Sequence, residues 1–199
     1  VTYNGVGARN VTDQTARERV SGFSSVIGFK NSPEGSIDAA VQAIVAARAA
    51  HEFLGVDAHG VSAQLSTTGN DTGHVILRGD KAGPNYSAAH VAATKAKLAA
   101  RGLPEVVVVD ASHGNSQKDH RRQIEVVRDL AGQIAGGERA IRGVMVESNL
   151  VEGRQDLDQR HPERLTYGCS VTDACVDPAT TEVMLAELAE AVRARRAAA

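Results

Sequence analysis

The chain has 199 residues, a formal net charge of −2 and a sequence pI near 6.4. Aromatic residues make up only 3%, and the one basic block is the Arg-rich end of the last expected helix, so we predict no nucleic-acid partner. No apolar run approaches the ~20 residues that span a bilayer, which argues against a membrane partner. Two cysteines near the C-terminus are typical of reduced thiols and predict a cytoplasmic protein.

Strand-like and helix-like patterns alternate along the chain. Strands are expected at residues 3–8, 25–29, 52–56, 106–110, 143–147 and 170–173. Helices are expected at residues 12–20, 32–50, 85–101 and 118–135, and from Pro178 onward. The runs VSAQLST (61–67) and HVILRG (74–79) are expected to pair as a β-hairpin. This alternation predicts one parallel α/β domain, either an open sheet or a barrel whose first three units are missing.

Three of these strand-like runs end in side chains that can bind a metal ion. They deliver His113, Glu147 and Asp173. Sites of parallel α/β enzymes assemble at the ends of strands, and one histidine with two carboxylates suits a hard or borderline divalent ion. Taken one at a time, a histidine or a carboxylate at such a place is more commonly structural.

Seven collinear motifs carry a family resemblance. They are GVGARN, GFKNSPEGS, HVILRG, GPNYSAAHV, VVDASHGNSQK, QIAGGERAIRGVMVESNLVEGRQ and YGCSVTDAC. With them the chain resembles the C-terminal half of a type I 3-deoxy-D-arabino-heptulosonate 7-phosphate (DAHP) synthase. The resemblance implies a TIM (β/α)8 barrel, here a partial barrel from the end of strand 4 through helix 8, with an inserted β-hairpin after strand 6. Residues 1–199 are then the C-terminal part of a single barrel domain, and the chain alone is expected to be an inactive fragment.

The resemblance also implies a reaction. Family members are metal-dependent transferases that condense phosphoenolpyruvate with erythrose 4-phosphate and water, giving DAHP and phosphate in the first step of the shikimate pathway to aromatic amino acids. Phosphoenolpyruvate carries a phosphate and a carboxylate, so its pocket needs fixed cations. The positions that match the family's phosphoenolpyruvate site are Ala8, Arg9, Lys30 and Arg78.

The implied cofactor is a divalent metal ion: manganese, iron, cobalt or zinc. His113, Glu147 and Asp173 match three of the family's four ligands, and the fourth is a Cys on the first barrel strand, which this sequence does not contain. His113 and Lys30 are the expected catalytic residues, Lys30 as a proton relay. Cys175 matches a family Cys close to the metal Cys. It is either an oxidation partner of that Cys or a small buried thiol beside the site, and the buried thiol is the favoured interpretation.

Two further partners follow from the resemblance. An aromatic amino acid is expected to act as effector near residues 19–24 and 53–65, although Gly55 stands where some inhibited forms carry Ser, which argues against control by phenylalanine or tyrosine. A homo-oligomer is expected for the full-length protein.

Two alternatives remain open from the sequence. The chain is either part of a working synthase or an inactive half-barrel that acts as an interaction or regulatory partner. A related enzyme, 3-deoxy-D-manno-octulosonate 8-phosphate synthase, shares the fold and the phosphoenolpyruvate chemistry, but the MVESN and TDAC contexts favour DAHP synthase.

Overall fold

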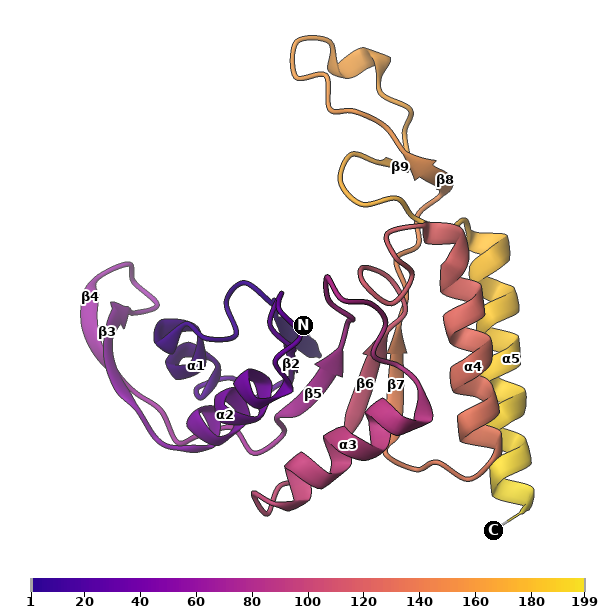
Figure 1. Cartoon of the computed structure of the whole chain (residues 1–199). Helices are drawn as coiled ribbons and strands as arrows, with labels where there is room; N and C mark the ends of the chain where they lie inside the picture. The colour runs from indigo at the N-terminus through magenta and orange to yellow at the C-terminus, as the bar shows by residue number, and fades with distance from the viewer. Residues whose placement is uncertain (1, 199) are drawn as a thin grey trace. The chain divides into compact units, whose positions relative to one another are not determined.

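The structure, a computed structural model, describes residues 2–198 and has a mixed α/β fold (Figure 1). It divides into two compact units. The first contains the chain up to Leu77 together with residues 93–107, and the second contains residues 78–92 and 108 onward. Helix α3 (Ala88–Ala99) and strand β6 (Val107–Asp110) each contribute residues to both units.

Three parallel strands form the core of the first unit. β1 (Tyr3–Val6) pairs with β2 (Val26–Lys30), and β2 pairs with β5 (His74–Leu77). Every residue of β5 is buried, as expected for a strand covered on both faces of a parallel sheet. Helix α2 (Ile37–Arg48) packs on β2, β5 and α1 (Gln14–Val20).

The β-hairpin of the first unit is not the one that was predicted. β3 (Glu52–Val56) pairs antiparallel with β4 (Ser62–Ser66), so the expected partner, residues 74–79, is wrong. The turn between β3 and β4 was missed: Asp57 Oδ1 accepts hydrogen bonds from the backbone of His59 and Val61, and Gly60 has φ +81°. Residues 75–77 are apolar without interruption and the whole strand 74–77 is buried, which is typical of a parallel core strand and not of a half-exposed hairpin strand. The hairpin therefore precedes β5.

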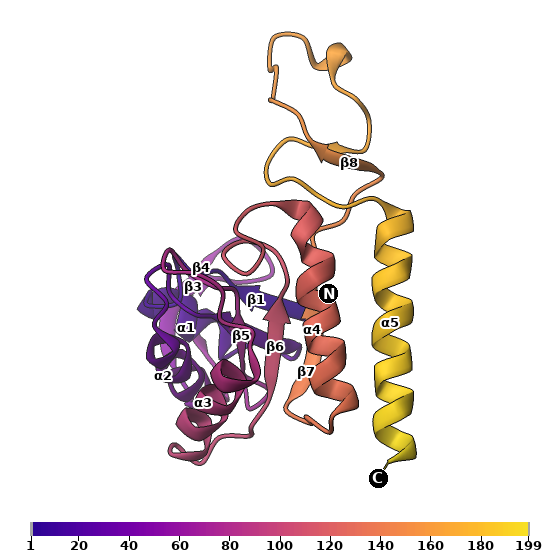
Figure 2. The same ribbon diagram turned by 45° about the vertical axis from the view of Figure 1, so that its right-hand side comes forward.

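The second unit is built around β6, β7 (Ile141–Met145) and two long helices. The short 3-10 helix His120–Arg122 leads into α4 (Gln123–Ala135), which packs against α5 (Pro178–Ala197), and Figures 1 and 2 show the two helices side by side. Asp177 caps α5 by accepting from the backbone of Thr180, and Pro178 begins the helix as predicted.

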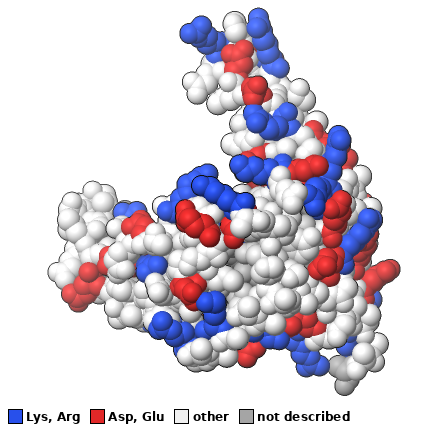
Figure 3. Space-filling view, viewed as in Figure 1, with Lys and Arg blue, Asp and Glu red and all other residues white. Residues whose placement is uncertain are grey.

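An extended arm leaves the second unit between β7 and α5. It contains β8 (Val151–Arg154), a short 3-10 helix at Pro162–Arg164 and β9 (Cys169–Ser170). On the face shown in Figure 3, acidic and basic side chains are intermingled. Among residues 2–198, no helix is long and apolar enough to cross a membrane.

Two predicted boundaries are wrong. The residues after Ser170 leave the strand, so Asp173 lies in a bend and not at a strand end. Helix α2 begins at Ile37, capped by Ser36, because residues 32–35 form a turn that closes at Gly35 with φ +87°. The predicted parallel α/β class is confirmed.

Candidate metal centre

His113, Glu147 and Asp173 come together in the second unit. Their ligand atoms lie within 4.8 Å of one another, although the residues are up to 60 positions apart in the sequence. His113 Nε2 lies 3.6 Å from Glu147 Oε1 and 3.8 Å from Asp173 Oδ2. The structure thus brings together the three residues that were predicted as metal ligands.

The backbone of the loop after β6 directs the His113 ring. His113 has φ 55°, a left-handed conformation that is uncommon for a residue with a side chain and is found more often at functional sites. The backbone N–H of Lys118 donates to His113 O at 2.8 Å and closes the turn. The strained conformation is therefore held by the loop's own hydrogen bonds.

The other two ligands lie on segments that are tied to each other. Glu147 follows the end of β7, and its backbone carbonyl accepts from Val176 N at 3.0 Å. Asn149 N in turn donates to Val176 O at 2.9 Å. These bonds anchor the bend that carries Asp173 next to the segment that carries Glu147.

A cavity of about 40 Å³ lies at the cluster. Besides the three predicted ligands, its lining includes two basic residues that were not expected there, Lys118 and His120. His120 Nε2 lies 2.9 Å from Glu152 Oε1, and Arg121 Nε donates to the same oxygen at 2.8 Å. The hydrogen bonds from Arg121 and His120 lower the pKa of Glu152, so His120 is engaged with the arm.

The donor set fits a divalent ion. A neutral imidazole nitrogen and two carboxylate oxygens are accepted by zinc, manganese, iron and cobalt alike, so the chemistry of the cluster supports a metal without selecting one. Among the described residues, this is the group of His, Cys, Asp and Glu side chains close enough to share an ion.

The loop that carries Arg78 contacts the loop that carries His113. Arg78 directly follows β5, and its backbone carbonyl accepts from Gly114 N at 3.0 Å. The two backbones approach so closely that a Cβ at Gly114 would lie 2.5 Å from Asp80 N, and one at Gly79 would lie 2.5 Å from Asn115 N. The glycines of RGD (78–80) and SHGN (112–115) are therefore required by this contact.

Two buried amides, which sequence reasoning missed, hold these loops. Asn85 Oδ1 accepts from Gly79 N at 2.7 Å, and Asn115 Oδ1 accepts from Asn85 N at 2.8 Å. Asn115 Nδ2 also donates to the backbone carbonyl of Asp110. Asparagine in loops is usually exposed, so only the packing of distant segments shows this role.

The remaining predicted substrate residues lie in the first unit. Ala8 and Arg9 follow β1, and Lys30 is the last residue of β2, whose neighbour in the sheet is β1. All three lie at the carboxyl ends of parallel strands, as predicted.

Comparison with known proteins decides the family, because a model described as "DAHP synthetase I family" matches residues 1–186. The chain belongs to the DAHP synthetase I family. It is 50% identical over 196 residues to the Phe-sensitive phospho-2-dehydro-3-deoxyheptonate aldolase of Escherichia coli, covering 98% of this chain and 55% of that protein. It is 48% identical over 204 residues to the phospho-2-dehydro-3-deoxyheptonate aldolase of Corynebacterium glutamicum, covering 100% of this chain and 55% of that protein.

A solved structure of the enzyme of that name from Francisella tularensis is also similar. Its TM-score is 0.94 with 48% sequence identity, and the match covers 98% of this chain and 56% of the other. The chain thus spans about half the length of the family members that it matches. The predicted resemblance is confirmed.

Cys175 does not join the metal cluster of this family member. The residue is buried, and burial raises the pKa of its thiol; a hydrogen bond with Ser170 opposes this effect, and the nearby carboxylates of Glu147 and Asp173 add to it. Its Sγ donates to the backbone carbonyl of Asp173 at 3.5 Å. The thiol lies outside the group of side chains close enough to share an ion, which agrees with the predicted packing role.

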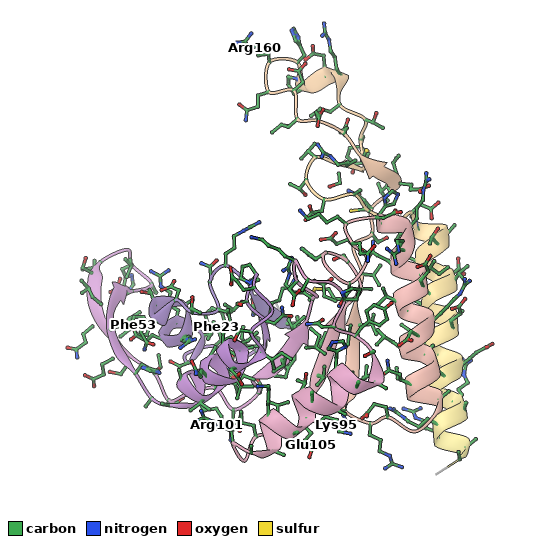
Figure 4. All side chains as sticks on the ribbon, viewed as in Figure 1. Phe23, Phe53, Lys95, Arg101, Glu105 and Arg160 are labelled. Atoms are coloured by element: carbon green, nitrogen blue, oxygen red, sulfur yellow. The ribbon has the colours of Figure 1, made fainter. Side chains whose placement is uncertain are left out.

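The first unit has a separate hollow of about 580 Å³ between the end of α1 and the β3–β4 hairpin. Phe23, Phe53 and Leu65 supply apolar lining and Arg19 supplies a cation, and Figure 4 labels both phenylalanines. A Cβ at Gly55 would overlap Leu65 Cδ1, so Leu65 occupies the space that a larger residue at position 55 would need. The hollow coincides with the two segments predicted to bind an effector.

Proposed function

We propose that the protein carrying this chain is a metal-dependent DAHP synthase, which condenses phosphoenolpyruvate with erythrose 4-phosphate and water to give DAHP and phosphate. The observation that supports this most is the convergence of His113, Glu147 and Asp173 in a member of the DAHP synthetase I family. We further propose that the complete fold is a TIM (β/α)8 barrel, of which residues 1–199 form part of a single domain.

The reaction needs cationic binding and proton control from the protein. The methylene carbon of phosphoenolpyruvate bonds to the aldehyde carbon of erythrose 4-phosphate, whose oxygen takes up a proton. Water adds to the carbon of phosphoenolpyruvate that carries the phosphate. Inorganic phosphate then leaves with cleavage of the bond between that carbon and the phosphate oxygen. A bound divalent ion would supply Lewis acidity toward the aldehyde or would orient the attacking water.

Arg9, Lys30 and Arg78 are the proposed partners of the phosphate and carboxylate of phosphoenolpyruvate. Guanidinium groups bind both anions in a bidentate manner, and the backbone N–H near Ala8 adds a donor for the phosphate. Lys30 ends a buried strand, so its ammonium group is attached to a rigid element, and in this proposal it also relays a proton.

His113, Glu147 and Asp173 would hold the ion. His113 would present Nε2 as its ligand atom, since that nitrogen lies closer than 4 Å to both carboxylates. The bond between Gly114 and Arg78 would keep the metal ligand in a fixed position relative to the cation that binds phosphoenolpyruvate. Such fixed geometry is what a condensation of two bound substrates requires.

An aromatic amino acid effector is part of the proposal. Relatives carry the names Phe-sensitive and tyrosine-inhibited. The hollow in the first unit supports binding of this ligand class, because Arg19 suits a carboxylate and the phenylalanines suit an aromatic ring. We propose that the protein forms a homo-oligomer, because Leu54 and Val56 on the hairpin are exposed apolar side chains. We propose a cytoplasmic location because both cysteines are free thiols.

Steady-state kinetics on the complete protein test the function. Removal of the metal with a chelator should stop the consumption of phosphoenolpyruvate, which is followed by its absorbance. Added Mn²⁺ should restore this consumption in the presence of erythrose 4-phosphate. Arabinose 5-phosphate in place of erythrose 4-phosphate tests the related octulosonate enzyme. If the protein turned over neither erythrose 4-phosphate nor arabinose 5-phosphate, the proposal would be contradicted. Faster turnover with arabinose 5-phosphate would reassign the substrate.

A further inference from the structure

The His113 ring contacts a buried carboxylate on the side away from the metal cluster. Asp110, the last residue of β6, is completely buried. Its Oδ2 lies 3.0 Å from His113 Nδ1, and Ser112 Oγ lies 2.7 Å from the same nitrogen. Asp110 Oδ1 accepts from both the backbone N–H and the hydroxyl of Ser112.

These contacts determine which ring nitrogen carries the proton. The Ser112 hydroxyl donates to Asp110 and therefore turns a lone pair toward His113. Nδ1 then faces two acceptors and must be the N–H donor of the neutral ring. The lone pair of the ring is left on Nε2, which points at Glu147 and Asp173.

A second buried side chain fixes the backbone of another ligand. Gln123, the first residue of α4, is completely buried. Its Oε1 accepts from Glu147 N at 2.8 Å, and its Nε2 donates to Glu147 O at 3.1 Å. One amide therefore pairs with both backbone groups of Glu147, in the way that a neighbouring strand would.

We propose that Asp110 and Gln123 are positioning residues of the metal centre: Asp110 sets the tautomer and orientation of His113, and Gln123 sets the position of Glu147. The inference rests on the proposed metal binding but not on the substrates. Neither residue belongs to the group of side chains that could hold the ion. Partners of this kind typically contribute about 10–100-fold to metal affinity.

Asp110→Asn isolates the tautomer effect. The asparagine oxygen can keep both hydrogen bonds from Ser112, which places the amide NH₂ against His113 Nδ1. That nitrogen must then accept, so the ring proton moves to Nε2, where a metal ion would bind. The variant keeps the volume and most of the hydrogen bonds of the site, but Nε2 now carries the proton and has no lone pair for the ion.

Gln123→Leu has a matched control on the same helix. Gln133 Nε2 also donates to a backbone carbonyl, that of Tyr86 at 2.9 Å, but Gln133 lies ten residues further along α4 and does not contact a metal ligand. Gln133→Leu should therefore affect stability without affecting the metal centre. Metal-free melting curves identify any variant that loses its fold. If Asp110→Asn does not fold, Asp110→Ala replaces it, because the Ser112 hydroxyl can then donate to His113 Nδ1 and move the ring proton to Nε2.

Mn²⁺ affinity is measured by calorimetry on the complete, metal-stripped protein, and the visible absorption of bound Co²⁺ reports ligand geometry. We expect Asp110→Asn and Gln123→Leu to weaken Mn²⁺ binding about 10–100-fold and to change the Co²⁺ spectrum, with Gln133→Leu unchanged. Wild-type affinity in folded Asp110→Asn and Gln123→Leu would overturn the inference. Absence of Mn²⁺ binding by the wild type would overturn it together with the metal centre, whereas absence of condensation alone would affect only the proposed function.

Discussion

Replacement of Gly114 by Ala tests the close contact between the loops after β5 and β6. The added Cβ would lie 2.5 Å from Asp80 N, 2.7 Å from Gly79 C and 2.9 Å from Asp80 O. All three are backbone atoms, so no rotamer change can relieve the overlap, and the loop itself must move.

The expected loss of stability follows from this geometry. Overpacking in a well-packed region costs about 1–3 kcal/mol, and weakening the hydrogen bond from Gly114 N to Arg78 O costs about 1 kcal/mol more. We therefore expect Gly114→Ala to lower the free energy of unfolding by about 2–4 kcal/mol, which corresponds to a melting temperature lower by roughly 4–16 °C. The neighbouring His113 should shift with the loop, and Mn²⁺ affinity should fall as well.

Gly132→Ala is the control. Gly132 lies inside α4, is exposed, and has no atom within 4 Å of an added Cβ. Alanine is the better helix former, so this change should raise the free energy of unfolding by about 0.5–1 kcal/mol. Both variants are unfolded with urea in the metal-free state. If Gly114→Ala were as stable as the wild type and bound Mn²⁺ equally well, the close approach of the two loops would be wrong.

Three further predictions concern pH, metal and substrate. Burial lowers the pKa of His74, whose Nδ1 donates to Thr72 O and whose Nε2 accepts from the Tyr3 hydroxyl. As the pH falls below the unfolded-state pKa of about 6.5, the unfolded chain binds a proton at His74 before the folded chain does, so the free energy of unfolding should decrease. His74→Gln, which does not titrate, should show a smaller fall in urea midpoints between pH 7 and 5, and equal slopes would contradict the buried neutral histidine. Mn²⁺ at about 100 times its Kd should stabilise the wild type by about 2.7 kcal/mol but should hardly stabilise Glu147→Ala, as read by thermal shift; an equal shift in both would exclude Glu147 as a ligand. Arg78→Met should raise the KM for phosphoenolpyruvate at least about tenfold with little change in the KM for erythrose 4-phosphate, and initial rates with an unchanged phosphoenolpyruvate KM would exclude that role.

The local sequence was sufficient to predict the parallel strands β1, β2, β6 and β7 and to single out three candidate metal ligands. Apolar runs that end in a polar residue predict both the strand and the place where its last side chain emerges, and this reasoning identified His113 and Glu147. The same reasoning placed Asp173 at the end of a strand, but that strand ends at Ser170. Asp173 lies in a bend whose position depends on hydrogen bonds to segments distant in the sequence.

Strand pairing and the buried polar contacts were decided by the tertiary structure alone. Residues 62–66 pair with 52–56 and not with 74–77. Burial in the parallel sheet stabilises residues 74–77 more than a half-exposed place in a hairpin would. Asp110, Gln123, Asn85 and Asn115 carry no signal in the sequence, since polar residue types are usually exposed. Folding removes each of these side chains from water and leaves it a specific hydrogen-bond partner. For Gln123 and Asn115 that partner lies on a segment 24 and 30 residues away, which sequence periodicity cannot identify.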